Sequence, residues 1–112
     1  MSETTTEGTE FVKVTLRVLG GKWKILILWH LRDETKRFSE LNRLMPGISE
    51  KVLTQQLREL EKDGLVLRVS HPSKSPKVEY SFTDYGHSLI PVLEILCHWG
   101  EHHMVLYGKT PT

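Results

Sequence analysis

"GISEKVLTQQLRELEKDGLVLR", residues 47–68, decides the fold, because it holds a turn, a capped amphipathic helix and the start of an apolar alternation. Ser49 is a good N-cap, and Ile48 before it can pack against Leu53 as a hydrophobic staple. A glycine follows the last turn and is a typical helix end. The buried side is expected to consist of three residues at helical spacing, Leu53, Leu57 and Leu60.

The polar face of this helix has an order along its axis. Lys51, Gln55 and Arg58 lie opposite the leucines, with Thr54 on the flank, whereas acidic residues mostly come later. A recognition helix enters the major groove by its N-terminal part, where arginine or lysine suits guanine and glutamine suits adenine. A solvated helix face has the same composition, so this face alone does not decide between DNA and water.

A shorter helix comes before this one. Leu41, Leu44 and Met45 form its apolar side, Ser39 is its expected N-cap, and a Pro-Gly pair at residues 46–47 stops it. A short helix, a turn of about three residues and a longer capped helix with donors at its start indicate a helix-turn-helix.

After the longer helix, the spacing of apolar residues changes from the helical period to a period of two residues. Apolar residues alternate with polar ones over residues 65–70 and 77–82, so two strands flank the tip "HPSKSP". The sequence therefore predicts a β-hairpin, or wing. The tip offers His71, Lys74 and Lys77, which suit a phosphate backbone or a minor groove. Polar loop tips are common in any protein, so this feature is weak by itself.

The remaining chain predicts one domain with short tails. A first helix over residues 10–19 ends at a Gly-Gly pair, and residues 22–33 form a strongly apolar central helix. Residues 1–9 and 109–112 are predicted to be disordered tails, so the domain spans residues 10–108. The expected fold is mainly α with a small β-hairpin wing.

The last helix carries more apolar surface than a small core can cover. It follows Thr83, a good N-cap, and Pro91 predicts a kink or a break between a short helix and a longer one. An exposed apolar stripe indicates a partner helix. The stripe consists of Leu89, Val92, Leu93, Leu96, Trp99 and His103.

Composition limits the function classes. The net charge is +1, but bases outnumber acids between residues 13 and 58, which is a weak sign of an anion-binding face. The polar start and the short apolar run "ILILW" predict no signal peptide and no membrane span, and the single cysteine fits a reducing compartment, so we expect the cytoplasm. We expect neither an enzyme nor a cofactor, because no phosphate-binding loop and no nucleophile beside a base is recognisable.

Cys97 and the residues after it raise two alternatives. Cys97 is a candidate redox residue beside the expected interface, but a lone helical cysteine is more often a small apolar filler, which we favour. His98, Glu101 and His102 share one helix face at metal-ligand spacing. Exposed histidines are the commoner explanation, so we assign no metal site.

Three segments, "GGKWKILILWHL", "RFSELNRLMPGISEKVLTQQLRELEKDGLVLR" and "KVEYSFTDYGHSLIPVLEILCHWG", together resemble the HxlR family of bacterial transcriptional regulators over about residues 12–99. The resemblance implies a winged helix-turn-helix. It is carried by Gly20, Gly21, Lys22, Trp23, Arg37, Phe38, Glu40, Leu41, Ile48, Ser49, Leu53, Leu57, Arg58, Leu60, Glu61, Gly64, Leu65, Arg68, Val78, Tyr80, Thr83 and Gly86.

The resemblance also implies a homodimer that is held together by the first and last helices. The helix that begins at Ser49 is then expected in the major groove, with the wing over the backbone. A two-fold dimer reads a pseudo-palindrome, and we expect it to act as a repressor. The expected interface residues are Phe11, Leu16, Leu89, Leu93, Leu96, Trp99 and His103. The expected DNA-binding residues are Arg37, Ser39, Ser49, Lys51, Thr54, Gln55, Arg58, Lys74 and Lys77.

Three alternatives stay open. Arg58 can pair with Glu61 or Glu40 and anchor its helix instead of contacting DNA. A winged helix can also serve as a protein-interaction module without specific DNA binding. Family members that sense electrophiles or oxidants carry a cysteine near the start of the first helix, where this chain has Thr9 and Glu10. A small-molecule or redox effector is therefore not assigned.

Overall fold

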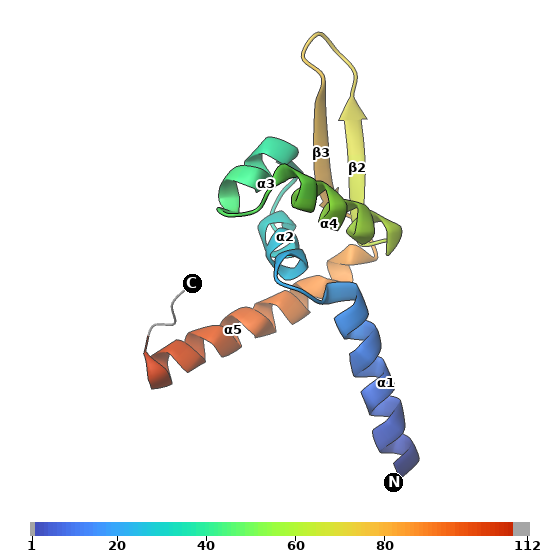
Figure 1. Ribbon diagram of the computed structural model, residues 1–112, viewed down its shortest axis with the longest axis vertical. Helices are drawn as coiled ribbons and strands as arrows, with labels where there is room; N and C mark the ends of the chain where they lie inside the picture. The colour runs from blue at the N-terminus through green and yellow to red at the C-terminus, as the bar shows by residue number, and fades with distance from the viewer. Residues whose placement is uncertain (1, 109–112) are drawn as a thin grey trace.

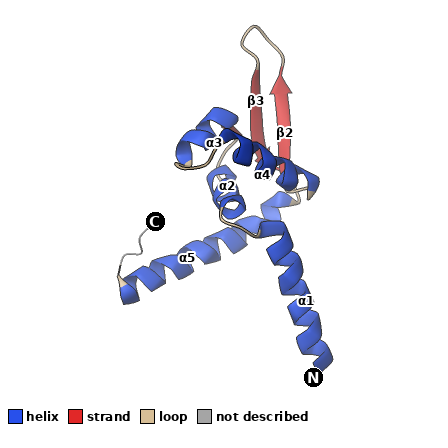
Figure 2. Ribbon diagram, in the orientation of Figure 1, coloured by secondary structure: helices blue, strands red, loops and turns tan. Residues whose placement is uncertain are grey.

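The computed structural model describes the backbone of residues 2–108 and the side chains of residues 7–108. The helices gather at the base of a small antiparallel sheet, whose β2–β3 hairpin projects away from them (Figure 1, Figure 2). The predicted tail at residues 109–112 lies outside the described residues. The elements are α1 (Ser2–Leu19), α2 (Trp23–Leu31), β1 (Lys36–Arg37), α3 (Phe38–Leu44), α4 (Glu50–Lys62), β2 (Val66–His71), β3 (Lys77–Phe82), the 3-10 helix η1 (Gly86–Leu89) and α5 (Ile90–Tyr107).

The core lies between α2, α3, α4 and the first turns of α5. The strongly apolar α2 contributes Ile27 and Leu28, neither of which has exposed surface, as expected for a central helix buried on two faces. The predicted apolar stripe of α4 is confirmed, because all of its members are fully buried: Leu53, Leu57 and Leu60.

The start of α4 follows the predicted capping chemistry. The Val52 amide donates a hydrogen bond to Ser49 Oγ at 3.1 Å. Ile48 is buried in the same apolar cluster as Leu53. Gly47 has a φ of +95°, a left-handed conformation that glycine adopts without steric cost. The Pro-Gly turn and the cap therefore fix where α4 begins.

The sheet has one strand more than predicted. β2 and β3 form the expected hairpin, with Val66 opposite Phe82 and His71 opposite Lys77. β1 pairs with the other side of β3, so the strand order is β1-β3-β2. β1 has two residues, and a two-residue strand is too short to show the alternation that identifies strands in a sequence.

The predicted start of the first helix is wrong. α1 begins at Ser2 rather than at residue 10, so residues 2–9 are helical and not a disordered tail. A polar segment can be helical where it continues an existing helix, because propagation costs far less free energy than nucleation. The end is as predicted: α1 stops at Leu19, and Gly21 has a φ of +86°.

The break predicted at Pro91 is confirmed. The 3-10 helix ends directly before α5, and Pro91 lies at the start of α5, where its missing amide hydrogen removes no helical bond. Thr83 joins this region to the sheet. Thr83 Oγ1 accepts a hydrogen bond from the Gly86 amide at 2.9 Å and donates one to Gly64 O at 2.6 Å.

The molecule is extended. The Cα radius of gyration is 16.3 Å, whereas a compact domain of this length has about 13 Å. Figure 1 shows the cause: the β2–β3 hairpin projects on one side, while α1 and α5 reach away from the body on the other. In the described part of the chain, no helix is long and apolar enough to cross a membrane.

Candidate nucleic-acid interface

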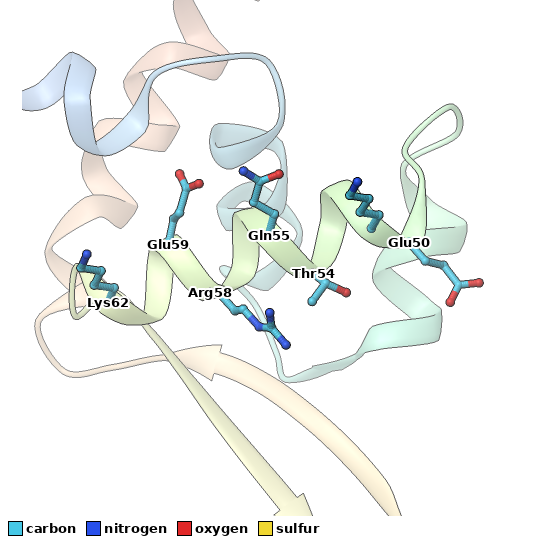
Figure 3. Close-up of a pocket in the computed structure, with 7 residues that line it drawn as sticks. Glu50, Thr54, Gln55, Arg58, Glu59 and Lys62 are labelled. Carbon is cyan, nitrogen blue, oxygen red and sulfur yellow. The ribbon is translucent and has the colours of Figure 1, made fainter.

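The outer face of α4 carries the donors that the sequence predicts. Lys51, Gln55 and Arg58 are exposed and Thr54 is half-buried. With Lys62, they line one open surface along this helix. Figure 3 shows Thr54 and Arg58 on the side of α4 that faces the strands, and Gln55 on another side. We call Lys51, Thr54, Gln55, Arg58 and Lys62 the outer face of α4.

Arg58 is not anchored inside the domain. Among the described residues it forms no ion pair and no hydrogen bond, neither with Glu61 nor with Glu40. It lines a hollow of about 500 Å³ between α4 and the sheet, together with Arg68 and Glu61. Two guanidinium groups and one carboxylate leave an excess of positive charge there, so Arg58 is available to a phosphate or a base edge.

The N-terminal end of α4 is polar and exposed. Ser49 uses its hydroxyl oxygen as the helix cap, and its hydroxyl hydrogen is still free to donate to a phosphate. The unpaired amides of a helix N-terminus carry partial positive charge and favour anions. Lys51 adds a full charge in the same turn.

Arg37 and Ser39 are exposed at the start of α3. The expected N-cap at Ser39 is wrong, because α3 begins at Phe38 and Arg37 occupies the cap position. The Arg37 amide donates a hydrogen bond to Glu40 Oε1 at 2.8 Å. A glutamate at the third helical position that accepts from the cap amide is half of a capping box, so Glu40 was the signal for the true start.

The two predicted wing lysines differ in their partners. Lys74 is exposed at the tip, and no ion pair of Lys74 occurs within residues 7–108. Lys77 is half-buried, and its Nζ lies 3.8 Å from Glu79 Oε2. His71 Nε2 lies 2.7 Å from the other oxygen of the same carboxylate. Lys74 is therefore the wing cation that is free to contact a phosphate backbone.

One acid lies beside the donors of α4. Glu59 Oε1 is 2.6 Å from Nζ of Lys24, a residue of α2 that is only 6% exposed. The hydrogen bond from Lys24 and the charge on Lys24 lower the pKa of Glu59; burial opposes them, and a hydrogen bond from Gln55 and the charge on Lys62 add to the lowering. Glu59 is therefore ionised at neutral pH, with its countercharge inside the chain.

The sequence interpretation missed several basic residues of this region. Arg68 is exposed on β2, where its Nη1 lies 3.3 Å from Ser70 Oγ. Its cross-strand partner is the buried Tyr80, so Arg68 lies on the side of the sheet that faces α4, which the alternation did not indicate. Lys62 lies at helical spacing from Arg58, so extending the outer stripe by one turn would have found it. Lys24 gave no such signal, because its helix looks uniformly apolar.

A second surface is apolar and lies on α1 and α5. Phe11 and Leu16 of α1 are exposed, as are Leu96 and Trp99 of α5. Leu93 is a correction to the expected interface, since it is 1% exposed and fills the chain's own core. Leu89 and His103 are half-buried.

Two side chains of α5 have different surroundings from those predicted. Cys97 is exposed, so the preferred interpretation of an apolar filler is wrong, and a redox role stays a prediction. His103 stacks on Trp99 at 5.4 Å between ring centroids and tilts against Tyr107 at 5.0 Å. Aromatic contacts therefore run along one side of α5 beyond the core.

A capped helix with exposed donors, preceded by a shorter helix and flanked by a projecting β-hairpin, defines the winged helix-turn-helix class of DNA-binding proteins. The profile of the HxlR-like helix-turn-helix family matches residues 18–106. The chain belongs to this family, as the sequence resemblance predicted.

Known proteins agree with this assignment. The HTH-type transcriptional regulator YtcD of Bacillus subtilis (strain 168) is 54% identical over 100 residues, which cover 88% of this chain and 79% of YtcD. The crystal structure of YtcD superposes with a TM-score of 0.80 over 83% of this chain and 95% of that one. The redox regulator HypR in its reduced form is 45% identical, with a TM-score of 0.80 over 88% of this chain and 98% of HypR.

YtcD is named as a transcriptional regulator and HypR as a redox regulator, and neither name describes an enzyme. The predicted winged helix-turn-helix fold is confirmed, and so is the predicted function in its general form: the chain is a DNA-binding transcriptional regulator.

Proposed function

We propose that this regulator acts in the cytoplasm as a homodimer that binds a pseudo-palindromic operator and represses transcription from it. In each protomer α4 enters the major groove and the wing follows the backbone. The observation that carries the proposal is the outer face of α4, where Lys51, Gln55 and Arg58 are exposed on a helix whose apolar side is fully buried.

The placement of the charges supports this mode of binding. Lys51 and Arg58 offer hydrogen bonds to guanine and Gln55 to adenine, while the cap at Ser49 faces the phosphates. Arg37 and Ser39 precede α4 in the same motif, and Lys74 extends the basic surface along the wing. Thr54 and Lys77 are half-buried, so we expect smaller contributions from them.

The apolar surface of α1 and α5 supports the dimer. Phe11 is 68% exposed, Leu16 63%, Trp99 67% and Leu96 45%, which is more large apolar surface than a monomer usually leaves in water. A two-fold dimer through these helices presents two copies of α4. The half-sites are then about one helical turn of DNA, or a small multiple of it, apart.

The experiment is selection of bound duplexes from a random pool by the full chain at about physiological salt, followed by titration of the enriched duplex against salt. We expect a two-fold motif and a steep fall of affinity with salt, since counterions are released from phosphates. Enrichment of a single half-site contradicts the dimer. No enrichment contradicts sequence-specific binding and favours a protein-interaction module.

Repression is tested separately. A dimer that covers an operator at a promoter hinders access by the polymerase, so a reporter behind the selected motif should lose expression when the chain is present. A rise in reporter expression would contradict the proposal. A matched reporter with a scrambled motif is the control.

A further inference from the structure

Lys24 is the one buried charged side chain among the residues that the structure describes. Its neighbours on α2 include the fully buried Ile27 and Leu28, an environment in which an unpaired ammonium is strongly destabilising. Its Nζ lies 2.6 Å from Glu59 Oε1, and the two side chains are 8% and 43% exposed. The cation is thus inside the domain and the anion is at the surface.

Glu59 emerges on the side of the protein that meets DNA. It lines the same surface as Lys51, Gln55, Arg58 and Lys62. Figure 3 shows Glu59 and Gln55 projecting from the same side of α4. A bare carboxylate at this place would repel phosphates and offset one of the basic side chains of the outer face.

The ion pair removes this conflict without using a surface cation. Lys24 reaches Glu59 from α2, on the interior side of α4. Lys51 and Arg58 are therefore not needed to neutralise Glu59, and their charges stay available for DNA.

We propose that Lys24 supports DNA recognition from inside the domain: it neutralises Glu59 without itself touching DNA. The inference rests on the proposed entry of α4 into the major groove. It adds a buried residue of α2, which lies outside the outer face of α4, to the residues on which DNA binding depends.

The two partners should have opposite mutational signatures. Lys24→Met fills the buried space with an apolar side chain of similar length, and the remaining Glu59 is exposed enough to be hydrated, so the fold should tolerate the change. The variant should nevertheless bind the selected duplex about tenfold more weakly, as expected for one unshielded charge near phosphates. Glu59→Gln leaves a buried unpaired lysine, so it should lower the melting temperature and affect DNA binding less.

The test measures affinity for the selected duplex and melting temperature for the wild type, Lys24→Met, Glu59→Gln and the double variant. Lys13→Met, an equal charge change at an exposed position of α1 (67% exposed side chain), is the control. The double variant should recover affinity to within about threefold of the wild type, because the unshielded carboxylate is gone. The defect of Lys24→Met should also shrink as salt rises, because screening weakens charge repulsion.

Each outcome of this experiment either supports or overturns the proposed role of Lys24. Recovery in the double variant together with a salt-sensitive defect supports the proposal. A double variant that binds as weakly as Lys24→Met, or a Lys24→Met defect no larger than that of Lys13→Met, overturns it. Failure of the wild type to select any duplex would instead refute the proposed function, so the two failures are distinguishable.

Discussion

α4 and α5 both carry an apolar stripe, yet the chain buries the two stripes to different extents. The stripe of α4 is buried completely against the rest of the domain, whereas in the stripe of α5 Leu93 is 1% exposed but Leu96 and Trp99 are 45% and 67% exposed. α4 is stabilised within one chain and leaves a polar face exposed, while α5 leaves an apolar face exposed that the proposed dimer would bury.

The position of each helix explains the difference. α4 lies across α2 and the base of the hairpin (Figure 1), and its leucines belong to one buried apolar cluster with residues of both. α5 contacts the body with its first turns and then extends away from it (Figure 1). Burial of a leucine contributes about 1.5–3 kcal/mol, so α4 stabilises the folded chain, whereas most of α5 would gain this contribution only in the proposed dimer.

The largest effect should come from removing apolar volume under α4. Leu57→Ala should lower the free energy of unfolding by about 2–5 kcal/mol, because Leu57 is fully buried and the change leaves a cavity. The measurement is urea unfolding at a protein concentration below that of dimer formation. Ile95→Ala on α5 is the matched control, with an expected change within about 0.5 kcal/mol. Equal losses of unfolding free energy in both variants would show that α4 and α5 do not differ in how much they stabilise the single chain.

The second prediction concerns association through α5. Trp99→Asp should weaken the dimer by at least about 2 kcal/mol, since a large exposed aromatic side chain is a typical hot spot of an interface. Sedimentation velocity across a dilution series measures this effect. His98→Asp places the same carboxylate on the polar side of α5, where His98 is 78% exposed, and should leave the dimer intact. A dimer that survives Trp99→Asp would show that another surface joins the protomers.

The contrast between α4 and α5 also shows which features could be predicted from the sequence and which could not. The leucine period, the cap at Ser49 and the strand alternation are local patterns, and each of them correctly identified an element. The stripe of α5 was recognised as well, but a stripe does not show where the chain's own core stops. For that reason Leu93 was assigned to an interface although it is buried in the core.

Features that depend on distant residues could not be predicted. β1 becomes a strand only because β3 lies beside it, with Lys36 opposite Tyr80. The pair of Lys24 and Glu59 joins two helices that are far apart in sequence, and no spacing rule connects these positions. Arg68 shares its side of the sheet with the buried Val66 and Tyr80, and its place in the hollow beside Arg58 depends on how the sheet packs on α4.

The third prediction distinguishes side chains that read bases from those that contact the DNA phosphate backbone. Arg58→Ala should relax base preference at one position of the motif by about 1–3 kcal/mol, whereas Lys74→Ala should weaken binding to all sequences about equally and reduce the salt slope by about one. Gln55→Ala should behave like Arg58→Ala. Affinities for the selected duplex and for random DNA measure the distinction. Equal losses on both kinds of DNA in all three variants would remove it.

The smallest expected effect on the free energy of unfolding comes from the N-terminal caps of α4 and α5. Ser49→Ala should lower the free energy of unfolding by about 1 kcal/mol, because the Val52 amide loses its partner. Ser88→Ala is the control: Ser88 lies in η1, two residues before α5, and does not cap that helix. It donates only an exposed hydrogen bond to Tyr85 O at 2.7 Å, so the change should stay within about 0.5 kcal/mol.

Ser49→Asp separates the cap from the proposed DNA contact. Aspartate caps a helix as well as serine does, so thermal unfolding should show unchanged or higher stability. The added carboxylate should nevertheless weaken DNA binding, since it stands where α4 is expected to face phosphates. Unchanged affinity in this variant would mean that the start of α4 stays outside the groove. The exposed donors further along α4, Gln55 and Arg58, would then make the first contact with DNA.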